Sequence, residues 1–496
     1  DKIAADVFCL KADFAESSGT HNTGMAVLID EALRKLNYKV KPQTQDDRIR
    51  TTVVGYPILV FHKETPSSNT EFIGKYNLDD DKSSVQVFGF TEGCECWEFL
   101  NNTADRCLFK AADFTGTDWL NDFEGRYPDG HEDASNLSKL CQWIVSCKGN
   151  PSKFKEECAE HFNVDWLLFY CLTTEIFGMV DQRAKNQMLT TYGERGASGE
   201  LLWYFIFYDN DTVLGINNEG QIAFDFNIES KDPHGDGHVW NGWNSELWTL
   251  VEAAYKDELK ALYQRIRQQQ VLSTDVTLEV LQNRQSDKWC QAVYNRDGFF
   301  KYIEPLLKSG NGAYLYALQG SRMRHRIWWT KNRFMYLDSK YAAGDYLKDY
   351  ATMRLYTPQI WQGVTPNADF NISINKPGYL QVKYGSYITD SIRGYAGGEY
   401  KIKSPAIQFN DTETIIYGIS AVKSLGDLSA KYPGTVDITN ALALEELIIG
   451  SLVKGYSNEN LTVLHTGSNE MLKKVNIANC PNLRQSLELT KCYSLE

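Results

Sequence analysis

The stretch WLLFYCLTTEIFGMVDQRAKNQMLTTYGERGASGELLWYFIFYDNDTVLG, residues 166–215, decides how the rest of the chain is interpreted. Its first part, Trp166–Val180, is mostly apolar and long enough for a buried helix. A polar cluster, Asp181–Asn186, follows, and after a glycine-containing turn Leu201–Tyr208 has the aromatic composition of a buried strand. The strand is predicted to end at Asp209 and Asp211. Because carboxylates placed just past a buried strand lie at the rim of a core, we expect a functional site here.

The spacing of the polar residues indicates a chemistry for this site. Asp181 and Asn186 have the D-x-x-x-x-N separation with which protein kinases place a catalytic Asp and a metal-binding Asn on one loop. Asp181 is then predicted to orient or deprotonate an acceptor hydroxyl, and Arg183 to contact the transferring phosphoryl group. Asn186, Asp209 and Asp211 are predicted to bind Mg²⁺. A purely structural alternative stays open, in which these Asp and Asn side chains only cap turns.

Three segments together resemble the CotH (spore coat protein H) kinase-like family: residues 165–215, LKADFAESSGTHNT at residues 10–23 and GKYNLDDDK at residues 74–82. The resemblance covers roughly residues 1–230 and extends to CotH-like domains carried on bacteriophage virion proteins, which have a long C-terminal extension as here. It implies an atypical protein-kinase-like fold with ATP and Mg²⁺ as cofactors. No His-Arg-Asp triplet and no G-x-G-x-x-G loop is found in the sequence. An active kinase and a catalytically inactive scaffold therefore both stay open.

Lys11 is a candidate nucleotide-binding residue. Val7–Leu10 is a short apolar segment that is predicted to form a strand, and Lys11 ends it. This pattern is similar to the V-A-I-K strand of kinases, whose lysine contacts phosphate. A strand-end lysine in solvent is the alternative.

The chain is predicted to be a multi-domain α+β protein. Residues 1–130 are expected to form a kinase-like N-lobe and connecting segment, with a hairpin made of residues 51–63 and 71–78. Residues 131–347 are expected to form a helical, kinase-like C-lobe that contains the metal and phosphate site. Beyond residue 348 short alternating segments separated by Pro, Gly and Asn indicate a β-sandwich-like module over residues 348–440.

Residues 441–496 are expected to begin a leucine-rich-repeat-like solenoid. The pattern Val475-x-Ile477-x-x-Cys480-x-x-Leu483 recurs twelve residues later, from Leu487 to Leu495. The interval is shorter than the roughly 20 to 29 residues usual for such repeats. Because a solenoid needs about three repeats to bury its core, the chain is expected to continue beyond Glu496.

The net charge and the lengths of the apolar runs argue against two classes of protein, those that bind nucleic-acid backbones and those that span a membrane. A formal net charge of -13 and a pI near 5.3 argue against binding to nucleic-acid backbones, which requires a basic surface. Apolar runs are too short for a membrane span. The eleven scattered cysteines indicate reduced, buried thiols in a protein that matures in a cytoplasm.

Three functions are consistent with these patterns. The first is a bacteriophage virion structural protein, from the tail or head-tail region, made in the bacterial host cytoplasm and bound to other virion proteins or to copies of itself. The second is an active atypical kinase that transfers phosphate from ATP with Mg²⁺. The third is a bacterial surface or spore-coat protein that uses its solenoid for adhesion.

Overall fold

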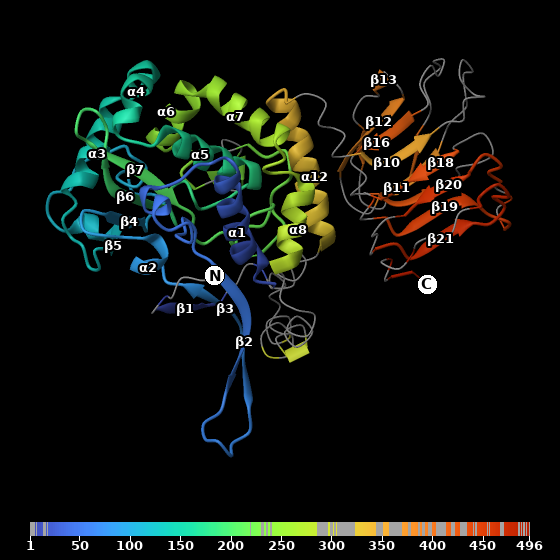
Figure 1. Cartoon of the computed structure of the whole chain (residues 1–496), viewed down its shortest axis with the longest axis horizontal. Helices are drawn as coiled ribbons and strands as arrows, with labels where there is room; N and C mark the ends of the chain where they lie inside the picture. The colour runs from blue at the N-terminus through green and yellow to red at the C-terminus, as the bar shows by residue number, and fades with distance from the viewer. Residues whose placement is uncertain are drawn as a thin grey trace. The chain divides into compact units, whose positions relative to one another are not determined.

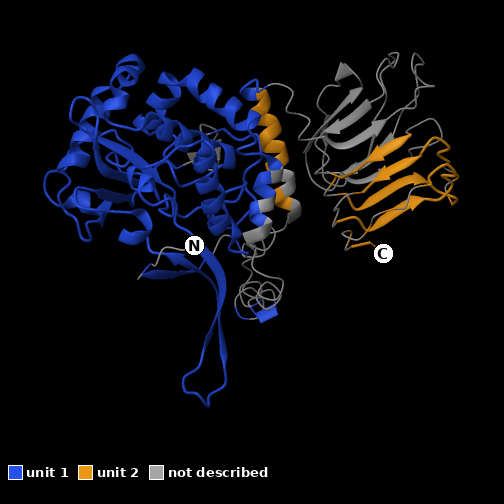
Figure 2. Ribbon diagram, viewed as in Figure 1, with its two compact units in different colours: residues 1–322, 340–343 blue, residues 323–339, 344–496 orange. Residues whose placement is uncertain are grey.

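The computed structural model describes residues 5–284 except residues 6, 13–15, 17, 219, 230–232, 235–236 and 239–240. It also describes residues 296–297, 301, 304 and 323–343, the strands between residues 351 and 426, and most of residues 434–495. The chain divides into two compact units (Figure 2). Unit 1 is residues 1–322 with 340–343, and unit 2 is residues 323–339 with 344–496.

Unit 1 combines two larger antiparallel sheets and the two-stranded antiparallel pair β8-β9 with surrounding helices (Figure 1). The two larger sheets have the strand orders β1-β3-β2 and β5-β4-β6-β7. The strands are β1 (Phe8–Lys11), β2 (Gly55–His62), β3 (Glu71–Asp80), β4 (Glu95–Phe99), β5 (Phe123–Tyr127), β6 (Met188–Arg195), β7 (Leu201–Ile206), β8 (Pro233–His234) and β9 (Gly237–His238). The α-helices are α1 (Thr20–Lys35), α2 (Val85–Phe88), α3 (Ser135–Ser146), α4 (Pro151–Glu157), α5 (Val164–Phe177), α6 (Glu246–Ala254), α7 (Lys256–Gln268) and α8 (Thr274–Arg284). Short 3₁₀ turns are η1 (Lys41–Thr44), η2 (Asp118–Asn121) and η3 (Cys158–Glu160).

The helix and strand predicted around the polar cluster are confirmed as α5 and β7. The side chain of Asn163 caps the start of α5 by accepting a hydrogen bond from the Trp166 backbone N–H at 3.0 Å. The helix ends three residues before Val180 because Gly178 adopts a left-handed conformation with φ 59°. The chain then turns into the predicted polar loop, so the end of α5 sets where that loop begins.

Tyr170 joins α5 to the strand and helix that flank the loop. Its buried ring lies 4.6 Å from the ring of Phe205, 4.5 Å from that of Phe207 and 5.5 Å from that of Trp248, measured between centroids. Its hydroxyl donates a 2.7 Å hydrogen bond to the backbone oxygen of Gln182. The polar loop is thus fixed to a close-packed aromatic core.

The predicted hairpin is confirmed as β2 and β3, which extend as an arm in Figure 1. The β1-β3-β2 sheet has an unusual distribution of residues between its two faces. Leu10, Leu78 and Tyr56 lie opposite one another across the three strands and are 55%, 37% and 43% exposed. On the alternate positions Asn77 and Asp79 are buried, and Lys11 pairs in register with Asn77. The inner face of this sheet is therefore polar, which indicates that it serves a site.

Unit 2 contains most of helix α12 (Met323–Lys340) and two sheets. One sheet has the order β13-β12-β16-β10-β18-β20, with β14 also paired to β12, and the other β15-β11-β17-β19-β21. The strands are β10 (Ala351–Tyr356), β11 (Phe370–Ile374), β12 (Gly378–Tyr384), β13 (Tyr387–Ile388), β14 (Ile392–Gly394), β15 (Glu399–Ile402), β16 (Glu413–Tyr417), β17 (Val422–Gly426), β18 (Thr435–Asp437), β19 (Glu446–Gly450), β20 (Val463–His465) and β21 (Lys474–Ile477). Both sheets continue across residue 440, where we placed a domain boundary, because β18 pairs with β20 and β17 with β19. The division into a β-sandwich-like module and a solenoid stays a prediction.

The last strands pair in parallel. Residues that pair between neighbouring strands are separated by more residues in sequence than the twelve of the sequence repeat. β21 pairs with β19, and Lys474 lies 28 residues after its ion-pair partner Glu446 at 2.8 Å. β20 pairs with β18 in the same parallel sense. Leu487 and Leu489 lie outside the described strands. The leucine-rich-repeat assignment is not confirmed, and any repeat here follows the longer step.

Two further expectations concern the cysteines and the membrane. Every described cysteine is unpaired, and all of them except Cys9 and Cys480 are buried, as predicted for reduced thiols.

None of the helices in the described part of the chain has the length and apolar composition needed to cross a bilayer.

Candidate functional site

Four of the predicted site residues come together at the edge of the polar sheet face. Lys11 is the last residue of β1, Asn186 ends the loop between α5 and β6, and Asp209 follows β7. The Lys11 ammonium forms an ion pair with one Asp209 oxygen, and Asn186 Nδ2 donates to the other oxygen at 2.9 Å. Lys11 also interacts electrostatically with Asp211. Residues separated by almost 200 positions in sequence thus share one carboxylate.

The backbone at this point is held in an uncommon conformation. Asn186 has φ 55° and Asp209 has φ 56°, both in the left-handed region that non-glycine residues seldom adopt. Gln182 Nε2 donates to the backbone oxygens of Tyr208 at 3.0 Å and of Asp209 at 2.8 Å, which fixes the strand end against the loop. Strain of this kind at two hydrogen-bonded polar residues is typical of a functional site.

Asp181 is buried and is oriented by a neighbouring loop. One of its carboxylate oxygens accepts a hydrogen bond from Asn241 Nδ2, and the Asn241 side chain accepts in turn from Asn102 at 2.8 Å. Burial raises the pKa of Asp181, and the hydrogen bond from Asn241 and the charges of Lys185 and Lys11 oppose that rise. A carboxylate with a raised pKa and a fixed orientation is suited to accept a proton.

Asp211 lies close enough to Asp181 and Lys11 for all three to affect each other's charge. Burial raises the pKa of Asp211, the Lys11 ammonium opposes the rise and Asp181 adds to it. The start of α1 holds this segment from the other side, since Asn22 Oδ1 accepts from the Asn210 backbone N–H at 3.1 Å. His21 Nδ1 lies 3.3 Å from the backbone oxygen of Asp211.

The structure does not bring Arg183 to this cluster. Its guanidinium is buried and donates to Thr174 Oγ1 at 3.0 Å, to the Cys171 backbone oxygen at 3.1 Å and to Glu252 Oε1 at 2.7 Å. It also lies 5.8 Å from the Trp248 ring centroid. All three of its nitrogens are therefore engaged with α5 and α6, and the geometry supports a structural role for Arg183, not the predicted contact with a phosphoryl group.

A second cationic group beside the site was missed in the sequence. Lys82 and Arg126 both pair with the buried carboxylate of Glu98, each at 2.5 Å. The Tyr208 ring has Lys11 at 4.9 Å and Lys82 at 4.6 Å from its centroid. The available signal was Glu98 itself, a charged residue within the apolar strand β4, because a buried carboxylate requires a cationic partner.

Asp79 is the other residue that sequence reasoning missed. It is 5% exposed and packs directly on Gly55, where a Cβ atom would lie 1.7 Å from Asp79 Oδ1. Burial raises its pKa to about 6, with Lys11 opposing and Asp80 adding to the shift. Its position opposite Cys9 in the polar face of β3 was readable only once the strand register was known.

The oxygen donors of the site fit Mg²⁺ in their chemistry. Carboxylate and amide oxygens from Asp209, Asp211 and Asn186 are hard ligands of the kind Mg²⁺ prefers. In the described residues no three His, Cys, Asp or Glu side chains are grouped as an all-protein metal cage. In phosphoryl-transfer enzymes one or two carboxylates hold Mg²⁺ together with substrate phosphates. The buried Asn210 side chain, which has no hydrogen-bond partner among the described residues, lies between the two Asp residues in sequence.

Comparison with known proteins agrees with the resemblance seen in the sequence. No curated protein matches the chain. The family model described as CotH kinase protein matches residues 80–283, which include Asp181, Asn186, Asp209 and Asp211 and leave out Lys11. The chain therefore contains a CotH kinase-like domain in residues 80–283.

Proposed function

We propose that the CotH kinase-like domain transfers a phosphoryl group from ATP to a hydroxyl group. The observation that carries this proposal is the Asp209 carboxylate, shared between the Lys11 ammonium and the Asn186 amide beside the buried Asp181. Kinases use the same residue types for the same chemistry: a lysine for the phosphates, an Asp and an Asn for the metal, and a second Asp for the acceptor.

Each residue has a role in the proposed step. Lys11 contacts the phosphates, and Asn186, Asp209 and Asp211 would hold Mg²⁺, which neutralises phosphate charge when it is bound. The oxygen of the acceptor hydroxyl forms a bond to the γ-phosphorus, and Asp181 accepts the proton that this hydroxyl loses. The bond from that phosphorus to the bridging oxygen breaks, and ADP leaves with the electron pair.

Nucleotide binding tests the proposal. Calorimetry with ATP and Mg²⁺ is expected to show saturable binding to the unmodified chain and none to the double variant Asp209→Ala, Asp211→Ala, because the variant lacks both carboxylates for the metal. An Asp129→Ala variant, which removes an exposed carboxylate elsewhere, serves as the matched control and is expected to bind normally. Absence of ATP binding to the folded, unmodified chain would refute the proposal.

We also propose that the protein is a structural component of a bacteriophage virion, made in the host cytoplasm. The support is the resemblance to virion-borne CotH-like domains together with an apolar pair on unit 2. Leu452 and Val453, just after β19, are 73% and 96% exposed, and we propose that they contact a neighbouring subunit.

Assembly tests this second proposal. Sedimentation and negative-stain microscopy of the purified chain are expected to show ordered rings or fibres that a Leu452→Ser, Val453→Ser variant does not form. A chain that stays monomeric at every concentration tested would contradict self-assembly through this surface.

A further inference from the structure

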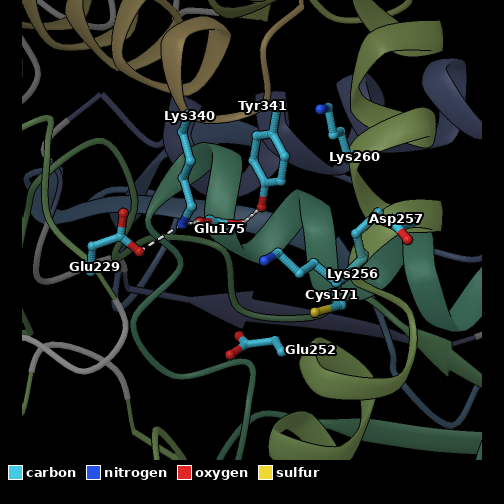
Figure 3. A pocket seen from close by; sticks show the side chains of 10 residues that line it. Cys171, Glu175, Glu229, Glu252, Lys256, Asp257, Lys260, Lys340 and Tyr341 are labelled. Atoms are coloured by element: carbon cyan, nitrogen blue, oxygen red, sulfur yellow. Dashed lines mark hydrogen bonds and ion pairs between the residues drawn. The ribbon is translucent and has the colours of Figure 1, made fainter.

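Unit 1 contains a second cavity, of about 750 Å³, that the phosphoryl-transfer proposal does not use. It lies between α5, the start of α7, the loop at Glu229 and the end of α12 (Figure 3). Charged side chains make up most of its lining: Glu175, Glu229, Glu252, Lys256, Asp257, Lys260 and Lys340, with Cys171, Leu259 and Tyr341. Its volume falls within the range of small-molecule sites.

Three of the four acidic side chains of this cavity are engaged by neighbouring donors. Lys340 Nζ pairs with Glu175 at 2.5 Å and with Glu229 at 2.6 Å, and the Tyr341 hydroxyl donates to the second oxygen of Glu175. Glu252 accepts from Arg183 at 2.7 Å. Each of these three carboxylates thus already accepts from a donor of the protein itself.

The two lysines of α7 differ from these carboxylates. Within the described part of the chain neither Lys256 nor Lys260 has a hydrogen-bond or ion-pair partner, and both are exposed. In Figure 3 the Lys256 ammonium points in among the lining side chains, and the Lys260 ammonium lies at the rim of the cavity. They are four residues apart on one helix, so they lie on the same face one turn apart. The Asp257 carboxylate points away from the interior of the cavity in Figure 3.

We propose that this cavity binds a small organic anion with two or more negative charges, held by Lys256 and Lys260. Two adjacent ammonium groups without partners attract phosphate or carboxylate groups through charge-assisted hydrogen bonds. The site is independent of the proposed phosphoryl transfer. It nevertheless contacts the same loop, because Glu252 and Cys171 line the cavity and hold Arg183, two residues after Asp181.

Calorimetry with pyrophosphate and with citrate, in the absence of Mg²⁺, tests the inference. At least one probe is expected to bind the unmodified chain with a single site, and the Lys256→Ala, Lys260→Ala double variant is expected to bind it about tenfold more weakly or worse. Binding of pyrophosphate alone identifies a phosphate-bearing ligand, and binding of both probes identifies charge as the shared requirement.

Two control variants locate the binding. The Asp209→Ala, Asp211→Ala variant is expected to retain it, which separates this cavity from the proposed ATP site. A Lys35→Ala, Lys39→Ala variant removes two exposed lysines of the same spacing elsewhere and is expected to bind normally. The inference is overturned if neither probe binds, or if the Lys35, Lys39 variant weakens binding as much as the Lys256, Lys260 variant does.

Discussion

Replacing Asp181 with asparagine is expected to lower the rate of phosphoryl transfer from ATP by about 10²- to 10⁴-fold, the usual contribution of a general base. Asparagine has nearly the same shape, and its side-chain oxygen still accepts the hydrogen bond that Asn241 donates to Asp181. It cannot accept a proton from the acceptor hydroxyl. The rate is measured as release of inorganic phosphate and as transfer of labelled phosphate to the protein itself and to peptides that contain Ser, Thr or Tyr.

Binding separates this effect from a loss of the site. Lys11 and Asn186 contact Asp209, and Asp181 takes no part in that contact, so affinity for ATP with Mg²⁺ is expected to be unchanged in the Asp181→Asn variant. A variant that binds ATP and keeps its full transfer rate would show that another group accepts the proton. A loss of both binding and transfer would show that Asp181 holds the nucleotide site together.

Replacing Asp79 with asparagine is expected to raise the free energy of unfolding at pH 7 by about 3 kcal/mol. Burial raises the pKa of Asp79 from 3.8 to about 6, and each pKa unit corresponds to about 1.4 kcal/mol. The folded state binds more protons than the unfolded state between these two pKa values, so this carboxyl lowers the free energy of unfolding as pH rises from about 4 to about 6. Above about pH 6 the decrease in the free energy of unfolding caused by the ionised Asp79 carboxylate is constant. Asparagine does not ionise, so the variant lacks this decrease.

Urea unfolding at two pH values tests this expectation. The gain in the free energy of unfolding should be present at pH 7 and absent below about pH 4, where the unmodified carboxyl is protonated in both states. An Asp129→Asn variant, in which an exposed carboxylate is lost, is expected to show no such gain. Equal stability of the Asp79→Asn variant and the unmodified chain at pH 7 would contradict the proposed cost of burial. A buried carboxylate that destabilises its own domain beside Lys11 indicates selection for the site, not for the fold.

Local patterns predicted the elements around the site well. The apolar run into Gly178 and the aromatic run into Asp209 each have one dominant periodicity and a clear end, so α5 and β7 were found within a few residues. Asn186 and Asp209 were identified because their residue types and order match a known chemistry. Their hydrogen bond, however, depends on how the loop after α5 packs against the end of β7, which a sequence pattern does not contain.

Arg183 and Asp79 show where sequence reasoning failed. Arg183 lies between two candidate catalytic residues in sequence, but a tight turn directs consecutive side chains to different sides, and its guanidinium packs against Trp248. Asp79 was overlooked because its run Asp79–Asp81 is typical of a solvated turn, whereas the register with β1 places Asp79 on the inner face. Both outcomes depend on the direction of a side chain, which only the assembled fold determines.

The strand β1, which carries Lys11, is attached to its sheet on one side only. β1 has four residues, lies at the edge of its sheet, and has side chains that are mostly exposed. Opening of such a short edge segment requires much less free energy than unfolding of a whole domain. Lys11 therefore lies on a short edge strand, and detachment of this strand would withdraw the cation from Asp209. We therefore expect that opening of β1 alone would change the charge balance of the site.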